Sequence, residues 1–305
     1  MRIAFGAHDG STTRRHDIVF WCSGWWLRSL IVLLLVSASA VAAAQERADQ
    51  NAVSSTPLVT GETLTIPSKA LGETRRINVS LPAPSASEAK AQFPVIYMPD
   101  GGLAEDFLHI AGLLQVLNGN GTMRPFVLVG IENTERRRDM TGPTVSAEDR
   151  KIAPRVGGSA AFRTFIRTEL MPLIKSRYRT TTETAIVGES LAGLFVVETF
   201  FLDHNLFDTY IAFDPSLWWN DDNLVKEAPE RLKAIRATSK TLYFASSNEP
   251  GIVKNTEQLA AILQQSATPG LTWRYDKMPG ETHGTIYHPA AIRAFRALFK
   301  PPAAK

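Results

Sequence analysis

Short apolar runs recur along most of the chain, and segments with a different spacing of apolar residues lie between them. Most of the runs lack polar alternation, which is typical of strands that are covered on both faces in a parallel sheet. Such runs begin at Ile77, Pro94, Phe126, Thr184, Tyr210, Thr241 and Thr272. They predict a mostly parallel, twisted sheet of about eight strands.

The intervening segments have the spacing of amphipathic helices. The clearest are residues 160–178, 191–201 and 255–265. Strands that alternate with helices predict an α/β fold in which helices cover both faces of the sheet. In such sheets the loops at the carboxyl ends of the strands carry the functional residues, so candidate chemistry is expected there.

The first part of the chain has the pattern of a secretory signal peptide. Arginines precede an apolar run at residues 30–36, and a tail of small residues ends at Ala44. Signal peptidase needs small residues before its cut, so cleavage is expected between Ala44 and Gln45, which makes residues 1–44 a signal peptide. The alternative is an uncleaved membrane anchor, because residues 18–44, although interrupted by Arg28, could supply the length of about 20 residues that a spanning helix needs. After cleavage no stable membrane insertion is expected.

Composition divides the remaining chain into a lead-in and one domain. Residues 45–56 are small and polar, which predicts a flexible lead-in. No long linker, repeat or low-complexity block follows, so residues 57–305 are expected to form a single domain. The one cysteine, Cys22, lies in the predicted signal peptide. The mature protein would then hold no thiol, which suits an oxidising compartment.

Charge and composition exclude several classes of protein. The chain has 33 lysines and arginines against 30 acidic residues, and this near balance gives no electrostatic field that would attract nucleic acid. A hydrophobic content of 44% is far too high for a disordered protein. The sequence lacks the spacings of metal sites, phosphate-binding loops and dinucleotide-binding turns, so no metal and no cofactor are expected.

A strand-to-helix turn at residues 188–193 carries the strongest candidate for chemistry. Its sequence, GESLAG, places Ser190 between a predicted strand and a predicted helix. Very small residues are needed two positions before and after a serine in such a turn, and Gly188 and Ala192 meet that need. The turn would expose the hydroxyl and direct the amide of Leu191 at the oxyanion of a tetrahedral intermediate.

A second match to the same pattern surrounds Ser159. This serine follows a polar loop that contains Pro154, and it opens a long amphipathic helix. Serine at such a position commonly caps the free amides of a helix. Ser159 is therefore expected to be a helix cap and Ser190 the nucleophile.

A serine hydroxyl needs a base to take its proton, and that base is commonly a histidine held by an acid. His283 lies in the polar loop PGETHGT after the last predicted strand, where the chain order serine, acid, histidine puts the base. The other histidines beyond residue 44 lie in or beside predicted helices, at His109, His204 and His288.

The acid is expected after the preceding strand. Glu249 is the first carboxylate beyond the strand that begins at Thr241, so it is the predicted third member. Glu281, close to His283, is a rival, and a site without a strong acid is a further alternative. A second oxyanion donor is expected in the early loop YMPDGG, where Gly102 lets the backbone approach a substrate closely.

Several separated motifs resemble those of the putative-esterase branch of the α/β-hydrolases, which includes esterase D, the enterobactin-type trilactone esterases and, more distantly, the mycolyltransferases. The motifs occur between Arg75 and Phe299 and read YMPDGG, GIENTERRRDMTGP, GESLAGLFVVE, FDPSLWWND and ETHG. The resemblance implies an α/β-hydrolase fold over residues 57–305.

The resemblance also implies roles for individual residues. A nucleophile, a base and two oxyanion amides are implied, at Ser190, His283, Gly102 and Leu191 respectively. Two positions depart from the family, whose members commonly have histidine where this chain has Glu189 and glycine where it has Ala192. Alanine adds one methyl group at the tightest point of the turn, which the neighbouring Gly193 makes tolerable. No role for Glu189 follows from the sequence.

Two further groups lie at the same edge of the predicted sheet. Trp218 and Trp219 follow a strand and would wall an apolar acyl or aryl pocket, or pack in the core. Arg138 belongs to a cluster of arginines on the loop after FVLVGIEN. It would bind an anionic group of the substrate or form a structural pair with Asp139.

These patterns predict an exported serine esterase, periplasmic or secreted, that hydrolyses a small-molecule ester through an acyl-enzyme. Siderophore trilactones, short acyl esters and aryl esters are candidate substrates. One alternative is acyl transfer to an alcohol by the same residues, and another is a catalytically silent hydrolase fold that binds a ligand. A peptidase is less favoured, because the sequence shows no added propeller or large lid domain that would select peptides.

Overall fold

The computed structural model describes residues 33–43, 45, 53–82, 91–235, 239–266 and 268–302. The chain divides into two units, residues 1–58 and 59–305. In the first unit residues 33–43 are helical. The rest of the predicted signal peptide, including Cys22 and Ala44 at the expected cut, lies outside the described residues. Within the described ranges no helix is long and apolar enough to cross a membrane.

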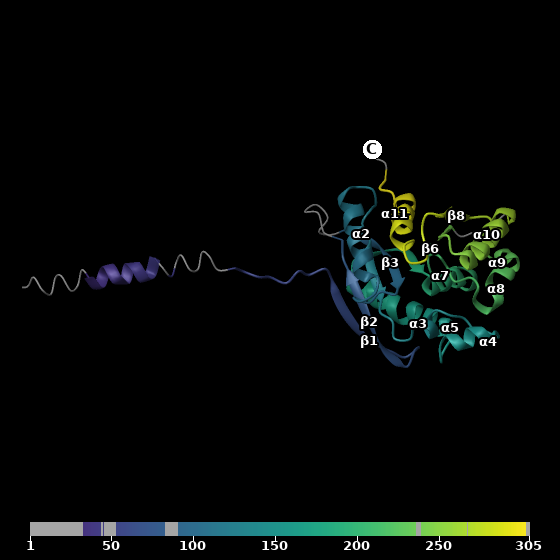
Figure 1. Ribbon diagram of the computed structural model, residues 1–305, viewed down its shortest axis with the longest axis horizontal. Helices are drawn as coiled ribbons and strands as arrows, with labels where there is room; N and C mark the ends of the chain where they lie inside the picture. The colour runs from purple at the N-terminus through teal and green to yellow at the C-terminus, as the bar shows by residue number, and fades with distance from the viewer. Residues whose placement is uncertain are drawn as a thin grey trace, which may run out of the picture. The chain divides into compact units, whose positions relative to one another are not determined.

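The second unit is built on an eight-stranded sheet with the order β1-β2-β4-β3-β5-β6-β7-β8 (Figure 1). Strands β1 and β2 pair antiparallel, as do β2 and β4, and the remaining neighbours pair parallel. The strands are β1 (Glu62–Ser68), β2 (Glu73–Ser80), β3 (Phe93–Pro99), β4 (Val127–Ile131), β5 (Thr180–Glu189), β6 (Thr209–Phe213), β7 (Lys240–Ser246) and β8 (Leu271–Lys277). The predicted mostly parallel sheet is confirmed.

Helices cover both faces of this sheet, as the alternating pattern predicted. They are α2 (Phe107–Gly119), α3 (Arg136–Asp139), α4 (Ala147–Ile152), α5 (Ser159–Phe165), α6 (Met171–Arg177), α7 (Leu191–Leu202), α8 (Trp219–Lys226), α9 (Ala228–Ala234), α10 (Pro250–Gln265) and α11 (Tyr287–Leu298). A π-helical turn, Ile166–Leu170, joins α5 to α6, so the predicted helix at residues 160–178 is one continuous but irregular segment.

Alternate side chains of the central strands enter two separate cores. On β5, Ile186 packs in the core with α5, α7, α9 and α10, whereas its neighbours Ala185 and Val187 pack in the core with α2 and α11. Successive side chains of a strand point to opposite faces, so an unbroken apolar run is what a sheet covered on both faces requires. Helix α7 is buried on almost every side, because it lies between the sheet and the outer helices.

The register of the parallel strands aligns their carboxyl ends. Glu189 of β5 is opposite Phe213 of β6, which is opposite Ala245 of β7. The residues that follow these three positions therefore emerge at the same edge of the sheet. This edge is where the predicted chemistry belongs.

Candidate active site

The turn after β5 holds Ser190 in a backbone conformation that side chains rarely adopt. Its φ and ψ angles are +61° and −119°. The amide of Ser190 donates to the carbonyl of Phe213 at 3.0 Å, and the Ser190 carbonyl accepts from the amides of Leu194 and Ser216 at 2.9 and 3.0 Å. These bonds fix a strained turn against the sheet, which is the geometry of a nucleophile elbow.

The small residues around Ser190 are required by this turn. A Cβ atom added at Gly188 would lie 2.7 Å from the Cβ atom of Ala192. A Cβ atom added at Gly193 would lie 3.0 Å from the carbonyl oxygen of Phe213. The alanine that departs from the family fits here because it faces a glycine across the turn.

His283 connects Ser190 to a buried carboxylate. Its Nε2 atom lies 3.1 Å from the Ser190 hydroxyl oxygen, and its Nδ1 atom lies 3.0 Å from Oδ2 of Asp214. The loop that carries His283 runs between β8 and α11. Two hydrogen bonds stabilise it, one from the Thr282 amide to the Thr285 hydroxyl and one from the Thr285 amide to the Thr282 carbonyl. The Asp214 hydrogen bond, which favours the imidazolium, is the main cause that raises the pKa of His283 above its ordinary value.

The carboxylate that reaches the histidine is Asp214 and not the predicted Glu249. Asp214 directly follows β6 and has an exposed fraction of 0%. Its Oδ1 atom accepts the amide of Ser247 and its Oδ2 atom accepts the Ser247 hydroxyl, both at 2.6 Å. Glu249 instead precedes α10, where its backbone carbonyl accepts the amides of the first helical turn.

The sequence contained a signal for Asp214 that the prediction did not use. The run YIAF that begins at Tyr210 ends in Asp214 and Pro215, so a carboxylate stood at the end of a predicted strand. Because β6 lies between β5 and β7 in the sheet, its end is nearer to Ser190 than the end of β7. The prediction assigned the acid to the wrong strand because strand order in space was not known.

The backbone amides of Leu191 and Gly102, the two predicted oxyanion donors, differ in their hydrogen bonding. Leu191 is the first residue of α7, and the amides of a first helical turn have no acceptor within their helix. The amide of Gly102 donates to Oε2 of Glu105 at 2.6 Å. A Cβ atom added at Gly102 would lie 2.9 Å from the carboxyl carbon of Glu105, so this side chain packs tightly over the backbone.

A network of charged side chains fixes the loop that carries Gly102. Asp100, which has a φ of +56°, accepts from Nδ2 of Asn133 at 2.6 Å. Its two carboxylate oxygens also accept from Nε and Nη2 of Arg136 at 2.7 and 2.8 Å. These hydrogen bonds join the loop after β3 to the loop after β4, at the same edge of the sheet as Ser190.

Arg138, the predicted anion-binding residue, is engaged by carboxylates of its own chain. It donates to Glu73 at 2.7 and 3.0 Å and to Asp139 at 2.7 Å. Arg75 shares both of these acceptors. Of the two readings that the sequence left open, the contacts match the structural pair with Asp139.

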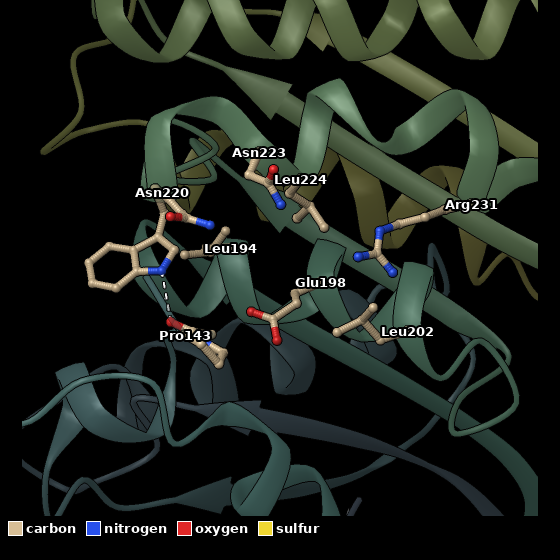
Figure 2. Close-up of a pocket in the computed structure, with 10 residues that line it drawn as sticks. Pro143, Leu194, Glu198, Leu202, Asn220, Asn223, Leu224 and Arg231 are labelled. Carbon is tan, nitrogen blue, oxygen red and sulfur yellow. Dashed lines mark hydrogen bonds between the residues drawn. The ribbon is translucent and has the colours of Figure 1, made fainter. Parts of the chain in front are cut away.

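The two tryptophans lie in different surroundings. Trp219 is 4% exposed and its indole N–H donates to the carbonyl of Gly142 at 2.9 Å, whereas Trp218 is only partly buried and packs against the same core. Trp219 also lines a cavity of about 140 Å³. Figure 2 shows Glu198 and Leu202 of α7 on one side of this cavity and Arg231 of α9 on the other.

Ser159 does not cap its helix. The N-cap position of α5 is Gly158, and the Ser159 hydroxyl donates instead to Oε1 of Glu198 at 2.6 Å. Arg163 donates to the same oxygen at 2.8 Å. Ser159 is the first residue of the helix itself, one position beyond the N-cap, and its hydroxyl donates a charge-assisted hydrogen bond to the buried carboxylate of Glu198.

No group of three or more histidine, cysteine or acidic side chains is arranged to hold a metal ion in the part of the chain that the structure describes. The polar residues at the carboxyl edge of the sheet are instead bonded to one another. Their arrangement of hydroxyl, imidazole and carboxylate is suited to acyl transfer chemistry, in which the hydroxyl attacks a carbonyl carbon.

Comparisons with known proteins show which family the chain resembles. A family model described as "Putative esterase" matches residues 68–284. The chain is 26% identical over 253 residues to ferri-bacillibactin esterase BesA of Bacillus subtilis (strain 168), which covers 75% of this chain and 86% of that protein. It is 29% identical over 187 residues to siderophore triacetylfusarinine C esterase of Aspergillus fumigatus, which covers 57% of this chain and 61% of that protein.

A solved structure extends the comparison to three dimensions. The IroE-like serine hydrolase of Shewanella oneidensis matches with a TM-score of 0.70 and 31% identity, covering 79% of this chain and 80% of that one. The shared architecture confirms the predicted α/β-hydrolase fold. With a family model that spans most of the chain, the protein belongs to the putative esterase family.

Proposed function

We propose that the protein is an exported serine esterase that hydrolyses siderophore-type esters through an acyl-enzyme. The observation that carries this proposal is the bonded series from the Ser190 hydroxyl through the His283 imidazole to the Asp214 carboxylate. The three side chains come from three different loops at one edge of the sheet. In a family of esterases, a serine, histidine and aspartate in contact support nucleophilic catalysis.

The first step forms the acyl-enzyme. Nε2 of His283 takes the hydroxyl proton of Ser190 while the Ser190 oxygen bonds to the ester carbonyl carbon. The carboxylate of Asp214 accepts a hydrogen bond from the Nδ1–H group of His283 and stabilises the imidazolium that results. The imidazolium then gives its proton to the alcohol oxygen as the ester bond breaks, and the alcohol leaves.

The second step repeats the chemistry with water. His283 takes a proton from water, the hydroxide bonds to the acyl carbon, and the proton returns to the Ser190 oxygen as the acid is released. In both steps the amide of Leu191 donates to the carbonyl oxygen while it carries negative charge. The amide of Gly102 would join it once the substrate oxygen displaces the Glu105 carboxylate.

The substrate class rests on the relatives. One is a ferri-bacillibactin esterase and another a siderophore triacetylfusarinine C esterase. Both act on siderophores, so a siderophore ester is the substrate we propose for this chain. Export rests on the arginines, apolar run and small-residue tail of residues 1–44.

The test of this function is an ester panel that contains p-nitrophenyl esters of several acyl lengths and a trilactone siderophore. It is run on the wild type, on Ser190→Ala and His283→Ala, and on Ser159→Ala as the matched control from the second G-x-S-x-A motif. Hydrolysis by the wild type and the control, with loss in the other two, is expected. Hydrolysis that survives Ser190→Ala would reject the serine mechanism.

The test of export is the N-terminus of the protein recovered from the periplasm or the medium. Mass spectrometry of the mature chain is expected to find Gln45 as its first residue. An intact N-terminus in the membrane fraction would support the anchor that the sequence left as the alternative.

A further inference from the structure

Two carboxylates, and not one, face the Nδ1 atom of His283. Oδ2 of Asp214 lies 3.0 Å from this nitrogen and Oε1 of Glu189 lies 3.4 Å from it. The register of the sheet explains the pairing. Glu189 ends β5 opposite Phe213 of β6, and Asp214 is the next residue, so both side chains start from the same edge.

The two carboxylates differ in how firmly they are held. Asp214 accepts two hydrogen bonds from Ser247 and one from His283, and is fully buried. The side chain of Glu189 is 18% exposed. Among the residues that the structure describes, it forms an ion pair with His283. Glu189 is therefore free to change its charge without breaking a hydrogen bond in the sheet.

We propose that Glu189 is a positioning residue that acts through His283, supplying a second negative charge to the imidazolium that forms when Ser190 is deprotonated. This inference rests on the proposed function. The Nδ1 proton is already donated to Asp214, so Glu189 acts by its charge at close range and not by orienting the ring.

The charge of Glu189 depends on its surroundings. The groups that face it are the carboxylates of Asp214 and Asp100, the cations of Arg136 and His283, and the phenol of Tyr287. Burial is the largest influence and raises the pKa of Glu189 to about 7, although His283 and Arg136 oppose the rise. Glu189 thus changes its charge in the same pH range in which a histidine base acts, and the two groups titrate as a pair.

The ionised form of Glu189 is one of the causes that raise the pKa of His283. Removing this charge lowers the pKa of the histidine, so the base becomes neutral, and active, at a lower pH. The same removal takes a negative charge away from the imidazolium that forms during catalysis. The two effects have opposite consequences for rate and can be separated by pH.

The test is the pH dependence of kcat/KM for Glu189→Gln against the wild type, with one ester from the panel. The acid limb of the profile is expected to move to lower pH, and the plateau of kcat is expected to fall about five-fold, which corresponds to about 1 kcal/mol of barrier. KM is expected to stay unchanged. Glu189→Asp keeps the charge and is expected to restore the acid limb toward its wild-type position.

The matched control is Glu257→Gln, the same chemical change on the surface of α10, where Glu257 pairs with Lys277. An active Glu189→Gln enzyme with an unshifted acid limb overturns the proposal and leaves the serine mechanism intact. Equal losses in Glu189→Gln and Glu189→Asp, with a lowered Tm and no pH shift, also overturn it, because they indicate a structural role. Activity in Ser190→Ala instead removes the proposed function itself.

Discussion

Two regions meet at the carboxyl edge of the sheet, and they are organised differently. The elbow region consists of Ser190, Asp214 and the loop of His283, and its functional groups are bonded to one another. The loop region consists of residues 100–105 and 132–139, and its candidate groups, the Gly102 amide and Arg138, are bonded to the carboxylates of Glu105 and Glu73, which lie outside the proposed catalytic series. Under the proposed function, the groups of the elbow are already in contact for reaction, whereas the Gly102 amide must exchange the Glu105 carboxylate for a substrate oxygen.

The difference follows from what supports each region. Ser190 and Asp214 follow the ends of two paired central strands, β5 and β6, so the register of the sheet fixes where their side chains start. The loop region is fixed by bonds between charged side chains, which are more easily exchanged with solvent or ligand than a packed strand. Substitutions in the elbow are therefore expected to affect catalysis strongly, and those in the loop region weakly.

The largest expected effect is that of Asp214→Asn. The neutral side-chain amide of asparagine cannot stabilise the imidazolium and favours the wrong tautomer of His283. We therefore expect kcat to fall about 10,000-fold. Glu249→Gln, which changes the carboxylate first predicted from the sequence, is expected to change kcat less than about two-fold. Steady-state kinetics on one ester compare the two variants, and a larger loss for Glu249→Gln would return the acid to the end of β7.

The next effect is that of pH on the wild type. The base must be neutral to accept the Ser190 proton, and the hydrogen bond with Asp214 raises the pKa of His283 above 6.5. Activity is therefore expected to be lost on acidification, with kcat/KM falling about ten-fold for each pH unit below the pKa. A profile measured at constant ionic strength whose acid limb lies below pH 6.5 contradicts the raised pKa.

A smaller effect, in the opposite direction, is expected in the loop region for Glu105→Gln. The neutral amide binds the Gly102 N–H less strongly than the carboxylate does, so a substrate oxygen displaces it more easily. The expected rise in kcat/KM is about five-fold. An unchanged kcat/KM in a variant with wild-type Tm would indicate that Gly102 does not serve as an oxyanion donor.

The smallest effect on activity is expected for Arg138→Gln. Arg138 links Glu73 to Asp139 and lies among the charges that fix the loop, so its loss is expected to lower Tm by about 2–4 °C. KM for an anionic ester is expected to change less than about two-fold. A KM that rises ten-fold at unchanged Tm would restore the substrate-binding role that the sequence first suggested.

The parts of the molecule that the sequence could predict are those set by local pattern. Buried strands were recognised because a sheet covered on both faces requires unbroken apolar runs, and the elbow because its turn requires Gly188 and Ala192. Strand β1 was missed, since it lies at the edge of the sheet and its side chains are largely exposed. The α/β fold class followed from this local pattern, and the family from the resemblance of several separated motifs.

The parts that the sequence could not predict depend on which segments become neighbours in space. To predict Asp214 as the partner of His283, one must know that β6 lies beside β5 in the sheet, and the order of the strands in the chain does not show this. The bond from Ser159 to Glu198 joins residues that are distant in the chain, and it replaces the local helix cap that the pattern favoured. The hydrogen bond from the Gly102 amide to the Glu105 carboxylate joins residues that are close in the chain. It could not be predicted because it depends on the conformation of the Glu105 side chain.

The central claim is that Ser190 is a nucleophile activated by His283. The most direct test is to react the protein with a fluorophosphonate and locate the adduct by peptide mass spectrometry. A single adduct on Ser190, slowed at least about 100-fold in His283→Ala, is the predicted result. An adduct on Ser159 or on another residue, or labelling of Ser190 at the same rate without His283, would contradict the account.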